Sequence, residues 1–480
     1  SVEDVRVFIR YDVQNISDKV FEKAGFKDAV RVLDMTEELE NEDDDMAYSV
    51  LTYAASEKAN AMGPATVDPR SGEILEADII WWHNVKQLLS NWIKIQTGAT
   101  NPAVLQANLS DELIGDAARF VATHEAGHSL GLRHNMRASA AYPTDSLRSK
   151  TFTDRMGGTA ASIMDYARFN YVAQPGDGVT MRSPHIGPYD YMAIEWGYRW
   201  FPTEEEAKEK LAAMLSKYTA PEYKYSEAQQ YRSAIDPRAM SEDLGDNPVK
   251  SAKYGIANLK RIIPNIERCT STGDKDQTWD DAAKLWNAII LQWDLYNYHV
   301  LANVGGIYLE NTVVGDGQST FTYVDKNRQK ESVQYLIDEV LTYPEWLFNP
   351  SVAKYTYLLK SGQENHPLTS FKNEQNYILW DLLANDRLIR MIQNEADQGE
   401  QKAFTATEMI DMLHKAVFTN IAQPNAIQRS TQKSMVDALI TAAAASEGVK
   451  INKSIYERDA TEDLDNNFCS RDLTSRSRDI

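Results

Sequence analysis

Three histidines in this chain have a spacing that suits a single metal ion. His124 and His128 are four residues apart, so one face of an α-helix would present both rings in the same direction. Gly131 allows the helix to end in a left-handed turn, after which the chain can bring in His134 as a third ligand. Glu125 follows the first histidine, beside the ion rather than on it. Three neutral ligands, an open position and an adjacent base are typical of catalytic zinc.

The pattern is specific enough to predict a class of chemistry. In a chain of 480 residues with 8 His and 23 Gly it arises by chance about 10⁻⁵ times. We therefore predict one catalytic Zn²⁺ ion held by His124, His128 and His134. Glu125 would take a proton from water at the open position and return it to a leaving amine. The alternative of three core histidines on a buried helix explains this spacing poorly.

The helix that carries the motif must aim the first two histidines into the protein. Ser110 is a favourable N-cap, and two acidic residues follow in the first turn, where they suit the helix dipole. The face that contains His124 and His128 also contains apolar residues at helical spacing, namely Leu113, Ala117 and Val121. We therefore expect this face to point to the core.

The first 200 residues mix strand and helix signals. Alternating apolar residues predict strands over the ranges 5–13, 28–35, 48–55 and 74–82. Helix signals and turn residues predict the end of a short helix at 21–26, a turn at 69–72, and helices at 85–95 and 188–200. Residues 135–187 are expected to be rich in loops. The remainder is mostly helical in pattern, with examples at 204–217, 279–301, 330–342, 372–395 and 406–419.

The composition excludes some partners. The formal net charge of −20 would repel phosphate backbones and anionic membrane surfaces, so we expect no nucleic acid partner. There is no run of about 18 apolar residues, so we predict no transmembrane segment. The chain begins at Ser1 without a signal-peptide pattern, as expected of a processed protein or a fragment. Nothing in the sequence indicates an oligomeric state.

Two further features leave alternatives open. Cys269 and Cys469 could form one disulfide or remain as two buried thiols. The acidic stretch 37–45 (EELENEDDD) could bind calcium, but a solvated acidic loop is the commoner outcome of such a composition. Calcium is therefore unsupported as a cofactor.

The histidine motif and several other segments are similar to one family of proteases. The motif is the metzincin signature, and Ser162–Tyr166 (SIMDY) resembles the Met-turn that follows it in metzincins. The segments at 21–26, 60–64, 68–75, 133–139, 162–174, 186–198 and 305–308 resemble the bacterial (Bacteroides-type) Met-zincin family of zinc-dependent metalloproteases. The similarity covers most of residues 5–200 and becomes weaker through the helical half.

This resemblance implies a fold and a set of domains. It implies an α+β metzincin-like catalytic domain at 1–202, with a twisted mixed sheet and the active-site helix. The upper part would extend to about residue 131, and the lower part, with the Met-turn, would span 132–202. A mainly α-helical C-terminal region would occupy 203–480. Only about fifteen residues separate the first two predicted strands, where metzincins normally place a long helix.

The resemblance also implies roles for single residues. Met164 would lie beneath the zinc-binding histidines, and Tyr166 would be a catalytic candidate that stabilises the oxyanion. Asn135 differs from the residues that astacins, adamalysins, serralysins and matrixins carry after the third histidine. The chain would be secreted or otherwise extracytoplasmic, either periplasmic or on the cell surface.

The predicted activity is hydrolysis of peptide bonds by a zinc metalloendopeptidase. A peptide or protein substrate would lie extended along an edge strand, at 61–67 or 74–80. Two alternatives remain open. One is an inactive metzincin-like binding module, against which the presence of Glu125 argues. The other is a zinc amidase that acts on modified or cell-wall peptides.

Overall fold

The computed structural model describes residues 14–34, 36, 48–56, 61–227, 234–352, 354, 367–419 and 422–446. The strand expected at 5–13 and the acidic stretch 37–45 lie outside these residues. By compactness the chain divides into two units, one with residues 1–228 and 241–247 and the other with 229–240 and 248–480. The chain therefore returns briefly to the first unit after it has entered the second. The functional domain limits at 202 and 203 stay a prediction.

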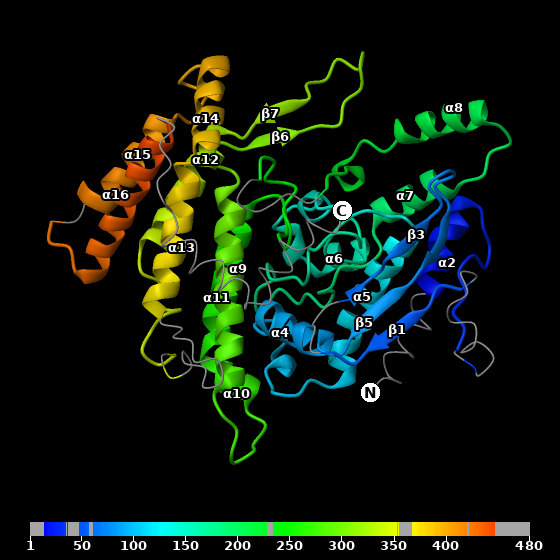
Figure 1. The fold of residues 1–480 in the computed structure, drawn as a ribbon, viewed down its shortest axis with the longest axis horizontal. Coiled ribbons are helices and arrows are strands. Elements are labelled where there is room, and N and C mark those ends of the chain that lie inside the picture. The colour runs from blue at the N-terminus through cyan, green and yellow to red at the C-terminus, as the bar shows by residue number, and fades with distance from the viewer. Residues whose placement is uncertain are drawn as a thin grey trace. The chain divides into compact units, whose positions relative to one another are not determined.

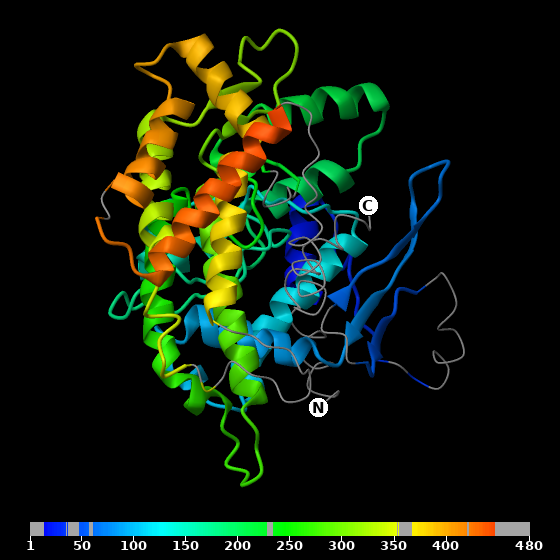
Figure 2. The ribbon, with the colours of Figure 1, turned by 60° about the vertical axis from the view of Figure 1, so that its left-hand side comes forward.

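The first unit contains a small mixed sheet in the strand order β1-β5-β2. β1 (Leu51–Ala54) pairs in parallel with β5 (Ile79–Trp82), and β2 (Ala61–Met62) pairs with β5 in the antiparallel direction. β3 (Ala65–Val67) and β4 (Ile74–Ala77) form a separate antiparallel hairpin, which extends beyond the sheet in Figure 2. Among the strands that the structure describes, β2 is therefore at an edge of the mixed sheet.

Two of the predicted strands differ from the structure. The range 74–82 is divided at Asp78, whose carboxylate accepts a hydrogen bond from the Val50 backbone at 2.8 Å, so β4 and β5 enter different sheets. Residues 28–34 form no strand. Asp28 has a left-handed φ of 52°, and Val30 packs against helices α2 and α7 instead of joining a sheet. The apolar residues alternate in this segment, but among the described residues no strand lies beside it with which it could pair.

Helices α4 (Val85–Thr97) and α5 (Asp111–Ser129) pack together beside the sheet (Figure 1). Both predicted helices are confirmed. Their shared core consists of apolar side chains from helices and sheet, among them Trp81, Leu89, Trp92, Val104, Ala118 and Ala122. This packing buries the inner face of α5 and fixes the direction in which its histidines point.

The chain after α5 is mostly loop through residue 187, as expected. Four short helical segments interrupt the chain in this part of the unit, the first of them before α5 and the other three after it. They are η2 (Pro102–Val104), η3 (Ser139–Ala141), η4 (Ser146–Arg148) and α6 (Lys150–Met156). α7 (Pro188–Tyr198) then packs against α2 (Gln14–Ala24), where the ring centres of Phe21 and Tyr198 are 4.9 Å apart. Gly25, with φ of 98°, ends α2 as expected. α8 (Glu204–Leu215) and η5 (Pro221–Tyr223) follow.

The second unit is mainly helical. α9 and α11 lie side by side, as do α13 and α16, and the β6–β7 hairpin projects from these helices (Figure 1). The elements are α9 (Pro248–Ile262), η6 (Ile263–Asn265), α10 (Ile266–Thr270), α11 (Asp280–Leu301), β6 (Ile307–Leu309), β7 (Phe321–Tyr323), α12 (Lys326–Leu336), α13 (Pro367–Leu382), α14 (Asn385–Gln398), α15 (Ala406–His414) and α16 (Ala426–Ser446). Two π-helical turns, Ile337–Leu341 and Lys415–Thr419, continue α12 and α15.

The helix predicted over 372–395 is in fact two helices. Ala384 adopts an extended conformation between α13 and α14. Arg387, which is only 2% exposed, donates from Nε to the carbonyl of Asp381 at 2.7 Å and from Nη1 to the carbonyl of Leu301 at 3.0 Å. This buried guanidinium therefore donates to backbone carbonyls at the ends of α13 and α11. If α13 and α14 formed one continuous helix, the Asp381 carbonyl would be bonded within that helix and would not be available to Arg387.

The expected α+β arrangement followed by a mainly helical region is confirmed. Within the described ranges, no helix has the length and apolar character needed to cross a bilayer. Cys269 is buried on α10. Cys469 lies outside the described residues, so the pairing of the two cysteines is still open.

Candidate metal centre

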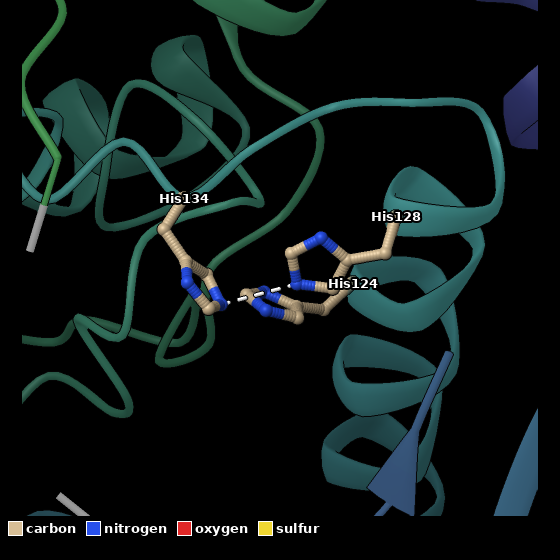
Figure 3. Close-up of side chains that lie close together, drawn as sticks. All are labelled: His124, His128 and His134. Carbon is tan, nitrogen blue, oxygen red and sulfur yellow. Dashed lines mark hydrogen bonds between the residues drawn. The ribbon is translucent and has the colours of Figure 1, made fainter. Parts of the chain in front are cut away.

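The three histidines of the motif meet at one point. His124 and His128 project from α5, and His134 projects from the chain that follows (Figure 3). One nitrogen from each ring lies within 4.8 Å of the other two, and the Nε2 atoms of His128 and His134 are 3.1 Å apart. Within the part of the chain that the structure describes, no other group of three or more metal-binding side chains lies so close together.

The reversal that brings in His134 depends on Gly131. Its φ of 81° is left-handed, as the helix end requires. The N–H of Gly131 donates to the carbonyl of His128 at 2.8 Å, and the N–H of Leu132 donates to the carbonyl of Gly127 at 3.0 Å. These two bonds form a Schellman motif. The predicted turn therefore has the hydrogen bonds that end a helix and reverse the chain.

Backbone carbonyls determine which ring nitrogens are available. Nδ1 of His124 lies 2.8 Å from the carbonyl of Ile163, and Nδ1 of His128 lies 2.8 Å from the carbonyl of Leu132. Because a carbonyl can only accept, each Nδ1 must carry the proton and donate it. Each Nε2 is then left with a lone pair, and these hydrogen bonds also fix the ring orientations.

His124 is buried and held neutral. Burial, and after it the nearby charges of His128, His134 and Arg168, lower the pKa of its imidazole well below the usual value. Its Nε2 atom is buried and has no hydrogen-bond partner among the described residues. A buried lone pair without a partner costs free energy unless something else binds it. Three imidazoles with converging nitrogens are a donor set that suits Zn²⁺.

Glu125 lies on the same turn of α5 but outside the group of three ligands. It is only 8% exposed. The chain after edge strand β2 passes close to it, because a Cβ atom added to Gly63 would be 3.1 Å from the Glu125 carbonyl oxygen and 3.6 Å from its Oε2. A larger residue at 63 would crowd this carboxylate. The edge of the sheet is thus brought directly beside Glu125.

Met164 lies against the underside of α5. Its side chain is fully buried, and a Cβ atom added to Gly127 would be 2.3 Å from Met164 Sδ. Gly127 lies between the two helical histidines, so this methionine supports the turn from which they project. The sequence pattern alone did not point to Gly127.

A buried aspartate holds the loop that contains Met164. Asp190 of α7 accepts hydrogen bonds from the Ser162 hydroxyl at 2.5 Å and from the backbone N–H groups of Ile163 and Gly187, both at 2.8 Å. Burial raises the pKa of Asp190 to about 6, against the opposing effect of these bonds. Sequence reasoning missed this residue, because it is remote in sequence from the motif.

Tyr166 lies next to the candidate metal ligands. Its ring stacks on His124 with ring centres 5.1 Å apart, and the centre of the His134 ring is 4.5 Å away. The Arg168 guanidinium carbon is 4.6 Å from the centre of the Tyr166 ring. The structure therefore brings this tyrosine together with two of the three histidines.

Asn135 joins three segments around the site. Its backbone N–H donates to the carbonyl of Met164 at 3.1 Å. Its side-chain amide donates to the carbonyl of Lys224 at 3.0 Å and accepts from the N–H of Ser226 at 3.1 Å. Asn135 is completely buried. The residue that distinguishes this chain from the better-known subfamilies thus connects the third histidine to the Met164 loop and to residues 224–226.

Comparison with known proteins identifies one family. A family model described as Met-zincin matches residues 106–425. No match was found among curated proteins or among solved structures. The matched region begins later than the segments noted in the sequence and runs much further into the helical unit. Since it covers more than half of the chain and includes all three histidines, the chain belongs to the Met-zincin family of the metzincin clan.

Proposed function

We propose that this chain is a zinc-dependent metalloendopeptidase with one catalytic ion. His124, His128 and His134 would hold the metal through their Nε2 atoms. The observation that carries this proposal is the buried Nε2 of His124, which has no hydrogen-bond partner among the described residues and faces the other two rings. Bound zinc would act as a Lewis acid and lower the pKa of water in the site.

Glu125 is proposed as the general base and acid. It would take a proton from the attacking water and deliver it to the leaving amine. Its position on α5 directly after His124 and its burial beside the three histidines support this role. Tyr166 is proposed to donate a hydrogen bond to the developing oxyanion, which its contacts with His124 and His134 support.

The substrate is proposed to bind as an extended strand beside β2. This strand is at the edge of the mixed sheet, and Gly63 just after it approaches Glu125 closely. Of the two edges considered from the sequence, 61–67 is favoured, because Gly63 within it lies close to the Glu125 carboxylate. In the other range, β5 lies between two partners, and β4 belongs to the separate hairpin with β3. We also propose the domain limits 1–202 and 203–480 and an extracytoplasmic bacterial location, both from the family resemblance. Fractionation of the producing cells tests the location.

The variant E125Q tests the proposed activity most directly. The full chain is purified without chelator, its zinc content is measured, and hydrolysis of an unfolded protein is followed. We expect one zinc per chain in both proteins and a fall in kcat/KM of about 10³-fold in E125Q. E195Q is the matched control, because Glu195 is also 8% exposed but lies on α7. It should retain full activity.

Two outcomes would contradict the proposal. If E125Q retains activity, Glu125 is not the base, and if the wild-type chain binds no zinc, the whole site is wrong. A peptide library separates endopeptidase activity from the amidase alternative. Cleavage within unmodified peptides supports an endopeptidase, whereas release of only modified or cell-wall groups would support the amidase.

A further inference from the structure

The side chain of Arg168 lies against Tyr166 and against the core of the first unit. Its Cζ atom is 4.6 Å from the centre of the Tyr166 ring and 4.0 Å from the centre of the Trp92 ring on α4. The Arg168 side chain is only 5% exposed, so both contacts are made away from water, where cation–π attraction is strongest. Trp92 is part of the buried core and gives the guanidinium a rigid support.

A carboxylate from a distant part of the chain binds the same guanidinium. Nε and Nη2 of Arg168 donate to Oε1 of Glu242 at 3.2 and 3.0 Å. The Glu242 side chain is 4% exposed. It belongs to residues 241–247, the short segment with which the chain returns to the first unit. The N–H of Gly245 donates to the carbonyl of Ser139 at 2.9 Å and so attaches this segment to the loop after the third histidine.

Both members of the pair have an unusual backbone conformation. The φ angles are +56° at Arg168 and +64° at Glu242, a region that residues with side chains rarely adopt. The N–H of Phe169 donates to the Gln96 side chain at 2.8 Å and holds the turn at Arg168. Such conformations persist only where the surroundings impose them, and they concentrate at functional sites.

Stability alone does not account for this arrangement. Burying two charges carries a desolvation cost, and apolar side chains of similar size often pack at least as well. Here that cost is combined with unusual backbone conformations at Arg168 and Glu242, and the buried guanidinium lies over the ring of Tyr166, a proposed catalytic group. We infer that Arg168, held by Glu242, is a positioning residue that sets the orientation of the Tyr166 ring. The inference rests on the proposed function, in which the Tyr166 hydroxyl must be aimed at the oxyanion.

Activity measurements on the full, zinc-loaded chain test this role. R168M, R168K and E242Q are each prepared with and without Y166F. We expect R168M to lower kcat about tenfold, with KM changed less than about twofold and zinc content unchanged, because small displacements of a catalytic group are costly. With Y166F present, R168M should cause no further fall in kcat. R168K keeps the charge but lacks the planar fork, so it should lose less activity than R168M.

A control variant separates positioning from the loss of an ion pair elsewhere in the unit, here one that is partly buried. R148M removes the arginine of the Arg148–Asp177 pair, whose atoms are 2.8 Å apart in the same unit. It should leave kcat unchanged. The inference is overturned if R168M lowers kcat equally with and without Y166F, if it changes only KM, or if it removes zinc.

A second measurement does not depend on activity. Tyrosines are labelled with ¹³C at Cζ in the metal-free full chain, and the Tyr166 resonance is identified by its absence in Y166F. R168M and E242Q should shift and broaden this resonance, and R148M should not. An unchanged resonance in R168M refutes the positioning role, whether or not the chain hydrolyses peptides. If the wild type hydrolyses no peptide and R168M still shifts the resonance, the proposed function fails and the positioning of Tyr166 stands.

Discussion

Replacing Asn135 by alanine should weaken both the fold of the first unit and its affinity for zinc. The backbone bond from Asn135 to the Met164 carbonyl would remain, whereas the side-chain bonds to Lys224 and Ser226 and the weaker bond from the Arg137 N–H at 3.4 Å would be lost. Each bond contributes about 1 kcal/mol net, and water can reach the two half-buried partners after the change. We therefore expect N135A to lower the free energy of unfolding by about 2 kcal/mol.

The effect on zinc follows from the position of Asn135 next to His134. A residue that orients a ligand typically changes metal affinity by about 10- to 100-fold, so we expect N135A to weaken zinc binding within that range. Competition with a chromogenic chelator measures the affinity, and urea unfolding followed by tryptophan fluorescence measures stability. The control is N265A, since Asn265 donates only to the Arg261 carbonyl at 2.9 Å on an exposed surface. It should change neither quantity measurably.

The substitution N135D adds a test with a defined dependence on pH. A carboxylate can still accept from the Ser226 N–H, but it cannot donate to the Lys224 carbonyl unless it is protonated. Folding would therefore raise the pKa of the new carboxyl, and the N135D protein would be less destabilised at low pH and more so as pH rises. If N135A and N135D both match the wild type in stability and zinc affinity, the connecting role of Asn135 is refuted.

Two further predictions concern buried charged groups. Burial raises the pKa of Asp190 to about 6, so the folded state binds more protons than the unfolded state between about pH 4 and 6. The free energy of unfolding, measured by urea titration at several pH values, should fall as pH rises through this window and level off above it. In D190N the free energy of unfolding should not show this fall. If the free energy of unfolding depends on pH equally in the wild type and in D190N, the pH dependence does not come from Asp190. R387M should destabilise the second unit by about 3 kcal/mol, because carbonyls of Asp381 and Leu301 lose their buried donor. Thermal unfolding measures this loss of stability. The control is R429M, which removes a bond from the exposed Arg429 to the Pro424 carbonyl at 2.6 Å and should change stability little.

The centre of the site could be predicted because its chemistry is local in sequence. His124, His128 and Gly131 lie within eight residues of one another, and helix geometry alone determines how they face. The hydrogen bonds that complete the site are not local. Asp190 reaches Ser162 across 28 positions, and nothing in the spacing of either residue predicts that contact.

The fold could likewise be predicted where it depends on local sequence, and not where it depends on distant residues. Helices α4, α5 and α11 follow from strong periodicity, which depends only on the residues of each helix. Periodicity could not show that residues 28–34 lack a neighbouring strand, because pairing depends on the rest of the chain. It also missed the break between α13 and α14, since Arg387 in α14 acts there on the end of α11.

Residues 241–247 belong to the first unit, although the chain reaches them only after it has entered the second. Glu242 binds Arg168, and the Asp246 carboxylate accepts the Thr144 N–H at 2.9 Å, so side chains of this segment contact the loop region that follows the histidine motif. Residues 229–240 and 248 onward belong to the second unit. The family match over residues 106–425 therefore includes both the histidine motif and the later segment that supplies Glu242 to Arg168.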